Sequence, residues 1–459
     1  MKITLIYPRF KYENVGSVQE PLGILSIATV LKNANYPVCF HDLTFAKDLS
    51  ILKNDIRDSS LVGFSSSSPL FGIAKGVLTY VKEINPNIKT VIGGPHPTQD
   101  PKDALDTGFD FAVIGEGENT ILELVKGIKE GRGREARGIA YKENGDIKIN
   151  PPREFIQDLD TVPIVDRKLL DYSKYLSFGM MATRGCPFKC FYCKPMLDKL
   201  FGNHLRKRSI PNIADEIEQL VKIDKNKVIY FKDDTLTIFP SSWFREFGSE
   251  LEKRNLRIKW GCNARVDTVD KEKLKLMKES GCVGLSFGVE SGSQKVIDFY
   301  NKGTKIEQVI DIFSLCRKLK LNTMAYLMIG APIETRQDLE MTYRLVRKIK
   351  PDHWLTCVTT PFPGNYLYEY AKKRGILKVN DYIEYDNAQN SKDLILTMKL
   401  DYLKKKDIEE YRNKLNHYMI RRTVRLRLWG VLTKPSEMKK LILEAPKVFN
   451  LLKTLLLRY

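Results

Sequence analysis

The sequence predicts an α/β protein with two parallel-sheet domains and a basic helical C-terminal extension. Short β-branched runs alternate with helix-length amphipathic stretches along most of the 459 residues, and glycine-rich loops follow several of these runs. Strands that alternate with helices form parallel sheets. Because 43% of the residues are hydrophobic, a chain of this length is expected to build two or three cores.

The first domain is predicted over residues 1–140, as a Rossmann-like sheet. Strands are expected at 2–7, 38–41, 61–65, 90–92 and 111–114, with helices around 22–31 and at 73–84. The carboxyl ends of parallel strands lie at one edge of the sheet, where open α/β sheets bind ligands. A ligand site is therefore expected in the loops after these strands.

A polar, proline-bearing segment over residues 141–178 is predicted to be an ordered connector. A second series of strands then predicts a partial (β/α)6 barrel over residues 179–375. Its strands are expected at 180–183, 228–231, 259–262, 283–287, 322–328 and 354–359. Helix-length stretches separate them, which is the pattern of repeated βα units. Residues 376–459 are predicted to form a basic helical C-terminal region.

The chain carries 75 Lys and Arg against 56 Asp and Glu, and the excess is concentrated at its end: residues 412–459 hold 12 basic residues and 2 glutamates. Over 436–459 the leucines share one helical face, so we expect an interfacial helix on an anionic membrane surface. Over 380–430 a helical cap packed on the barrel is the alternative. Nucleic-acid binding is not expected, because interleaved aromatic residues are sparse.

A cytoplasmic location is expected from the cysteine count and from the start of the chain. Eight cysteines are too few for a disulfide framework, and no secretory leader follows Met1. No run reaches the roughly 18 uncharged apolar residues of a membrane-spanning helix. Any membrane contact is therefore predicted to be peripheral.

Three cysteines, Cys186, Cys190 and Cys193, form a CxxxCxxC motif directly after a predicted strand. Three thiolates can ligate three irons of a 4Fe-4S cluster and leave the fourth iron open to a small molecule. Zinc is the alternative, but structural zinc normally takes four ligands, and no second CxxC or HxxxH lies nearby. Four further cysteines have no ligand spacing and are predicted to be core thiols: Cys262, Cys282, Cys316 and Cys357.

At this motif the sequence resembles the radical SAM superfamily, whose cluster reductively cleaves S-adenosylmethionine to a deoxyadenosyl radical. Later strand ends extend the resemblance, which implies contacts to adenine, the methionine amino group, the carboxylate and the ribose. The residues at the matching positions are Tyr192, Asp233, Asp234, Arg265, Glu290, Ser291 and Gly330. Each of them could alone be a turn, a cap or a strand exit, but a barrel gathers its strand ends around one site.

The glycine-rich loops of the first domain precede this motif in an order that resembles the cobalamin-binding domain of cobalamin-dependent radical SAM enzymes. The resemblance implies a cobalamin site made by Ser65, Ser66, Ser67, Gly93, Gly94, His96, Gly115, Glu116 and Gly117. The AspXHisXXGly motif that gives a histidine to cobalt is missing from the first loop, residues 8–16. Cobalamin is therefore expected to bind without a histidine ligand; the alternative is that the cofactor has been lost.

Taken with its cofactors, a 4Fe-4S cluster, S-adenosylmethionine and cobalamin, the resemblance implies C-methylation of an unactivated carbon. A lipid-like or tetrapyrrole substrate is expected, with flavodoxin or ferredoxin as the electron donor. No catalytic residue is assigned beyond the cluster ligands. One alternative is a radical SAM oxidative cyclase or rearrangement enzyme without methyl transfer. A non-catalytic cobalamin or cluster sensor is an alternative of another class.

Overall fold

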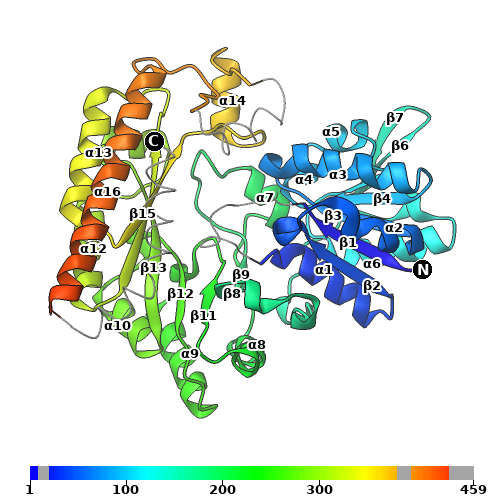
Figure 1. The fold of residues 1–459 in the computed structure, drawn as a ribbon, viewed down its shortest axis with the longest axis horizontal. Coiled ribbons are helices and arrows are strands. Elements are labelled where there is room, and N and C mark those ends of the chain that lie inside the picture. The colour runs from blue at the N-terminus through cyan, green and yellow to red at the C-terminus, as the bar shows by residue number, and fades with distance from the viewer. Residues whose placement is uncertain (9–19, 380–393, 434–459) are drawn as a thin grey trace.

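The computed structural model describes residues 1–8, 20–379 and 394–433. Figure 1 shows two parallel-sheet domains beside each other, the first in blue and cyan and the second in green and yellow. The carboxyl ends of strands from both sheets contribute to the cavity described below. The predicted fold class is confirmed.

The first sheet has the order β2-β1-β3-β4-β5-β6-β7, with β1 to β5 parallel. Its strands are β1 (Ile3–Tyr7), β2 (Val38–Asp42), β3 (Leu61–Ser65), β4 (Lys89–Gly93), β5 (Phe111–Val113), β6 (Ile139–Glu143) and β7 (Asp146–Ile149). Helices α1 (Leu22–Asn33) and α6 (Glu118–Lys129) pack on one face, and α2 (Lys53–Asp58), α3 (Phe71–Ile84) and α5 (Pro101–Asp106) on the other. The central strands β1, β3, β4 and β5 are buried on both faces, which explains why they are mostly hydrophobic.

An antiparallel hairpin extends this sheet beyond residue 140, into the segment predicted as the connector. Strands β6 and β7 are joined by Asn144 and Gly145, which both have positive φ angles. An Asn-Gly pair between two strands is the typical signal of a tight hairpin turn. The first sheet therefore continues to Ile149.

The second sheet is parallel throughout, in the order β15-β14-β13-β12-β11-β8. Its strands are β8 (Ser177–Met180), β11 (Val228–Phe231), β12 (Trp260–Ala264), β13 (Cys282–Glu290), β14 (Asn322–Ile329) and β15 (His353–Val358). The main core lies between these strands and the helices α8 (Ile210–Ile223), α9 (Ser241–Lys253), α10 (Lys271–Glu279), α12 (Ile306–Lys318) and α13 (Arg336–Ile349). This is the predicted partial barrel.

The first barrel strand lies earlier than the predicted 180–183. Phe178 and Met180 point into the core, and the chain then enters a short antiparallel ribbon of β9 (Thr183–Arg184) and β10 (Arg206–Lys207). We call residues 185–205, which connect the two ribbon strands, the cysteine loop. Thr183, which was predicted to end the first barrel strand, therefore belongs to the ribbon.

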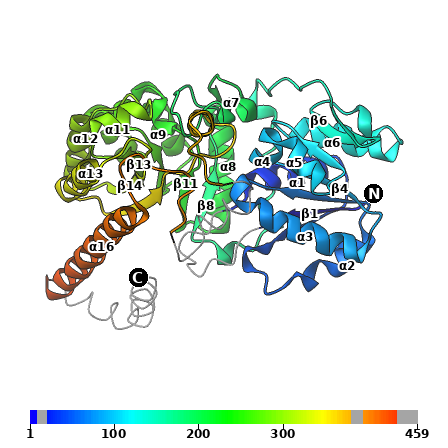
Figure 2. The same ribbon diagram turned by 90° about the horizontal axis from the view of Figure 1, so that it is seen from above.

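Helix α16 (Lys405–Thr433) packs against α13 and β15, and runs out from the barrel away from the first domain (Figure 2). The Tyr418 ring stacks on Trp354 with ring centroids 5.5 Å apart. A helical cap on the barrel is thus present in this part of the C-terminal region. The interfacial helix predicted over 436–459 lies outside the described residues. Within the described ranges, no helix is long and apolar enough to cross a membrane.

Candidate active site

A cavity of about 390 Å³ lies where the two domains meet. One wall comes from the carboxyl ends of the first sheet and from α1. The other comes from the end of β8, the ribbon, and α7 (Met196–Phe201), a helix within the cysteine loop. Most of the side chains that line it are apolar. The cavity therefore brings the glycine loops of the first domain next to the cysteine loop.

Six of the residues predicted to bind cobalamin line this cavity: Ser65, Gly93, Gly94, Gly115, Glu116 and Gly117. Gly94 has a φ of +100°, and a Cβ there would lie 2.9 Å from the carbonyl oxygen of Ser66. Only glycine suits that position without strain. The bare backbone and apolar walls fit a large, flat ligand such as a corrin ring.

The other three predicted cobalamin residues, Ser66, Ser67 and His96, are not among the residues that line the cavity. His96 is fully buried and stacks on Phe71, with ring centroids 3.7 Å apart. Its Nε2 lies 3.2 Å from a carboxylate oxygen of Asp103. His96 therefore helps to pack the first domain. The first loop, whose sequence lacks the cobalt-binding histidine, falls within 9–19, outside the described residues.

The cysteine loop is closed at its base and attached to the barrel. Gly185 has a φ of +91°, and a Cβ there would lie 2.5 Å from the carbonyl oxygen of His204. The two ends of the loop can approach this closely only because Gly185 has no side chain. The backbone N–H of Phe191 donates to the carbonyl of Tyr300 at 2.9 Å, and that of Tyr366 to the carbonyl of Lys194 at 2.7 Å. The loop is thereby held over the strand ends.

The three thiols predicted to hold the cluster lie close to charged side chains. Arg265 approaches Cys190, with Nη1 3.5 Å from Sγ, and its guanidinium lies 3.6 Å from the ring centre of Phe188. Burial raises the pKa of Cys186 and Cys193, so metal binding must release their protons. In the described part of the chain, no three His, Cys, Asp or Glu side chains are arranged to hold one metal ion.

Tyr192 and Glu290, both predicted to contact S-adenosylmethionine, are brought together by Lys302. The ammonium of Lys302 donates to Glu290 at 2.7 Å and lies 3.0 Å from the Tyr192 hydroxyl, which donates to Glu290 at 3.0 Å. Glu290 has a φ of +60°, a rare conformation for a residue with a Cβ. The sequence does not single out Lys302, because its partners are 12 and 110 residues away.

The two predicted aspartates have different surroundings. Asp233 is 1% exposed and accepts hydrogen bonds from the Ala182 backbone and the Thr183 hydroxyl. Burial raises its pKa to about 6. Asp234 stays accessible, and its carboxylate adds to the effect of burial on the Cys186 and Cys193 thiols. Of the two aspartates, only Asp234 raises the pKa of the Cys186 and Cys193 thiols.

Ser291 and Gly330, also predicted to contact S-adenosylmethionine, both form hydrogen bonds with buried side chains. Ser291 is fully buried, and its hydroxyl lies 3.1 Å from that of Thr342 on α13. Gly330, with a φ of +90°, donates its backbone N–H to Glu334. Glu334 also accepts from the Ala331 backbone at 3.1 Å, and burial raises its pKa to about 8. The sequence does not single out Glu334, although it lies four residues after Gly330.

One predicted core thiol is in fact exposed. Cys262, Cys282 and Cys316 are buried in the core, but Cys357 is exposed. It lies on β15, where Trp354 points into the core and alternate residues point to the opposite face. The prediction for Cys357 is wrong because the helices of the core cover only one face of β15, and Cys357 lies on the other face.

Comparison with known proteins identifies both domains. Residues 10–125 match the B12 binding domain, and residues 180–346 match the radical SAM superfamily. An uncharacterised methyltransferase of Pyrococcus horikoshii is 33% identical over 402 residues, which cover 84% of this chain and 86% of that protein. The chain belongs to the cobalamin-dependent radical SAM enzymes. The cofactors of this family are a 4Fe-4S cluster, S-adenosylmethionine and cobalamin.

Other radical SAM relatives agree with this assignment. The anaerobic magnesium-protoporphyrin IX monomethyl ester cyclase of Rubrivivax gelatinosus is 31% identical over 411 residues, 84% of this chain and 72% of that protein. The structure of the radical SAM methyltransferase TsrM from Kitasatospora setae has the same fold, with a TM-score of 0.71 and 17% identity over 82% of this chain and 75% of that one. The protein is thus an enzyme, and the sensor alternative is set aside.

Proposed function

We propose that this enzyme transfers a methyl group to an unactivated carbon of a hydrophobic small molecule. The shared cavity is the observation that supports this reaction. The glycine loops of the first domain form one wall and α7 of the cysteine loop forms the other. A radical generator and a methyl donor must reach the same carbon, so proximity of the two sites is what this chemistry requires.

In the proposed site, Cys186, Cys190 and Cys193 hold the cluster, Asp234 binds the methionine amino group, and Tyr192 lies beside adenine. When bound, the cluster supplies the electron that cleaves S-adenosylmethionine, and cobalamin supplies the methyl group. The substrate C–H hydrogen leaves in 5′-deoxyadenosine, and the methyl group takes its place. The methyl group given up by the cofactor would be restored from a second S-adenosylmethionine, which would leave as S-adenosylhomocysteine. Two electrons enter from an external reductant in each turnover.

The inner face of the barrel supports a hydrophobic substrate. Leu355 on β15 is 48% exposed, and Cys357 beyond it is exposed as well. An apolar ligand laid against these side chains would remove them from water. The Rubrivivax relative is named for a magnesium protoporphyrin ester, which makes tetrapyrroles the first class of substrate to test.

Cyclisation without methyl transfer is the second candidate function. It is favoured by the identity to the Rubrivivax cyclase, which is close to that of the Pyrococcus methyltransferase. The two reactions share their cofactors and begin with the same hydrogen abstraction. They differ in whether S-adenosylhomocysteine is formed.

The test is to reconstitute the protein anaerobically with iron, sulfide and cobalamin, reduce it with S-adenosylmethionine present, and quantify both adenosine products. We expect deoxyadenosine and S-adenosylhomocysteine. The Cys190→Ala variant should lose deoxyadenosine, omission of cobalamin should remove S-adenosylhomocysteine, and the core variant Cys316→Ala should keep both. Deoxyadenosine without S-adenosylhomocysteine would contradict methylation and support the cyclase function.

A further inference from the structure

A buried cluster of four charges joins the first domain, at the loop 115–117 and the start of α6, to the two ends of the cysteine loop. We call it the loop clamp; its members are Glu116, Glu118, Arg184 and Arg206. Arg184 pairs with Glu116 at 2.7 Å and with Glu118 at 2.5 Å, and Arg206 pairs with the second oxygen of Glu116 at 2.9 Å. The cluster contains two positive and two negative charges, so it is balanced without solvent ions.

The loop clamp lies at the base of the cysteine loop. Arg184 and Arg206 are directly opposite each other in the β9–β10 ribbon, and the three cluster ligands lie between them in sequence. Glu116 lies between Gly115 and Gly117, in the loop that lines the cavity. One carboxylate from the first domain therefore binds both ends of the loop that carries the cysteines.

Every member of the loop clamp has more than one polar partner. Glu116, Glu118 and Arg206 also form hydrogen bonds with uncharged groups, and Arg184 pairs with two carboxylates. Glu116 also accepts from the Ile156 backbone at 2.8 Å, and Glu118 from the Ser26 hydroxyl at 2.8 Å. Arg206 donates to the Phe201 carbonyl, at the end of α7, at 2.8 Å. The Glu116 side chain is only 4% exposed. Removing the Glu116 charge would leave Arg206 buried without an ion-pair partner, which is costly.

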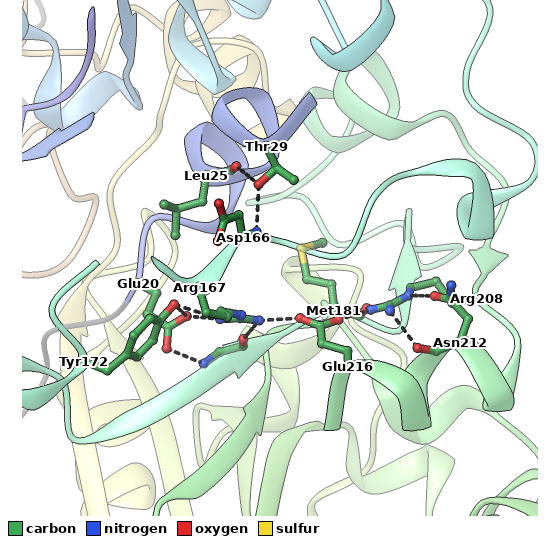
Figure 3. Close-up of polar contacts among 11 residues, drawn as sticks. Glu20, Leu25, Thr29, Asp166, Arg167, Tyr172, Met181, Arg208, Asn212 and Glu216 are labelled. Carbon is green, nitrogen blue, oxygen red and sulfur yellow. Dashed lines mark hydrogen bonds and ion pairs between the residues drawn. The ribbon is translucent and has the colours of Figure 1, made fainter. Parts of the chain in front are cut away.

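A second buried cluster, the connector clamp, joins the domains on another side of the cavity (Figure 3). It runs from Glu20 through Arg167 and Glu216 to Arg208. Arg167 lies in the connector, and its Nη2 also donates to the Gly179 carbonyl of β8 at 2.9 Å. Glu216 and Arg208 line the cavity. The connector clamp already joins the two domains. The loop clamp is therefore not needed for that contact, and we infer that its specific role is to hold the cysteine loop in place.

We propose that Glu116 is a positioning residue that sets the distance between the iron-sulfur cluster and the cobalt. The α7 wall of the cavity and the cluster ligands belong to one loop, and Glu116 ties that loop to the backbone around the corrin site. The proposal rests on the cofactor assignment of the proposed function, and it holds for methylation and cyclisation alike. Its consequence is that radical and cobalt chemistry stay directed at one substrate position.

The test compares the Glu116→Gln variant with the wild-type holoenzyme. Glutamine is isosteric with glutamate but uncharged, so Arg184 and Arg206 lose their shared counter-charge. The magnetic dipolar splitting between the reduced cluster and cob(II)alamin falls with the cube of their separation and reports it directly. We expect a separation that shifts or broadens by about 1 Å or more, a displacement that can cost about 100-fold in rate. Cobalamin absorbance and iron content establish that both cofactors are loaded before the splittings are compared.

The matched control is Glu123→Gln. Glu123 lies on the same helix as Glu118, but it pairs with Arg153 at the surface and its side chain is 44% exposed. Its holoenzyme should give the wild-type splitting. An unchanged splitting in Glu116→Gln would overturn the proposal. If that variant does not load both cofactors, Arg206→Gln decides: it removes one of the two ion pairs of Glu116, and an unchanged splitting there also overturns the proposal.

Failure of the proposed function would be distinguishable from failure of this inference. If the wild type forms deoxyadenosine without S-adenosylhomocysteine, methylation is contradicted, but the splitting can still be measured because both metal centres are present. Conversely, a wild-type splitting in Glu116→Gln, together with both adenosine products from the wild type, would leave methylation supported and remove Glu116 from its positioning role.

Discussion

Asp233 and Asp234 are adjacent in sequence, but only the Asp234 carboxylate raises the pKa of the Cys186 and Cys193 thiols. Asp233 is used to hold the turn between β8 and the ribbon through Ala182 and Thr183. A sequence match to a strand-end acidic motif covers both residues equally. Their separate roles become visible only when the direction of each carboxylate is known.

Replacement of each aspartate by asparagine should therefore have a different effect. Asp234→Asn should weaken S-adenosylmethionine binding about tenfold or more, the effect of losing a charge-assisted hydrogen bond, with the melting temperature unchanged. Asp233→Asn should lower the melting temperature, because a neutral amide is a weaker acceptor than a carboxylate and its NH2 group would face the Ala182 N–H, which also contacts the second carboxylate oxygen at 3.2 Å. Titration of S-adenosylmethionine into the reduced enzyme, followed by the EPR signal of the cluster, measures the first effect. Equal losses of affinity in the two variants would contradict this division.

Glu334 predicts a pH dependence of stability. Its folded pKa of about 8 lies above the value of 4.5 for an unperturbed glutamate, so the folded state holds its proton more tightly than the unfolded state. The stabilisation is complete below pH 4.5 and is lost as the pH rises through 8, by roughly 1.4 kcal/mol per pH unit between these values. Glu334→Gln removes this dependence and keeps an oxygen for the Gly330 and Ala331 N–H groups.

Urea unfolding of the wild type and Glu334→Gln at pH 6 and pH 8 measures the effect. We expect the variant to gain stability over the wild type by roughly 2 kcal/mol between the two pH values. A constant difference would show that Glu334 is already ionised at pH 6 in the folded protein.

At the scale of elements, glycines show where two elements touch. A Cβ on Gly292 would lie 2.4 Å from the Met341 carbonyl oxygen, so the segment after β13 packs on α13 backbone to backbone. Gly76, inside α3, has no heavy atom within 4 Å of the same point. Gly292→Ala should lower the melting temperature strongly, while Gly76→Ala should raise it slightly, because alanine stabilises a helix by about 0.5 to 1 kcal/mol relative to glycine. Thermal melts of the two variants compare these effects, and a mild Gly292→Ala variant would contradict the close packing.

Regular elements could be predicted from the sequence because their signals are local. Hydrophobic runs mark the strands that pack on helices. The Asn144-Gly145 pair is a local signal of the same kind: it marks a hairpin, which belongs to the first sheet although the predicted domain ended at residue 140. The position of β8 could not be read as easily, since the apolar run continues from the barrel into the ribbon. Lys302 and Glu334 are hidden for a related reason: their roles depend on contacts that the fold creates.

At the scale of the whole molecule, the sequence predicts the cofactors but not how the domains meet. The cysteine motif and the glycine loops are each recognisable alone. The loop clamp joins residues that are 68 and 90 positions apart, and its arginines look like ordinary surface charges in the sequence. Charges such as these could be assigned only after the two sheets were placed side by side.

The basic C-terminal segment carries a prediction for the whole enzyme. Residues 436–459 combine leucines at helical spacing with Lys447, Lys453 and Arg458, so the full chain should float with anionic liposomes and not with neutral ones. Truncation of these residues should abolish flotation. Replacement of the three basic residues by serine tests the contribution of charge, and flotation that survives truncation would contradict the membrane role.

The shared cavity also implies an order of events during synthesis of the chain. A growing chain folds from its N-terminal domain onward, and Glu116 leaves the ribosome before Arg184, α7 and Arg206 exist. During that interval the nascent first domain offers one half of a corrin site, with two hydrated carboxylates where ion pairs will form. With cobalamin placed as proposed, α7 and the ribbon complete the cavity only after the cysteine loop has been synthesised, so we expect the first domain to retain cobalamin only once that loop is present.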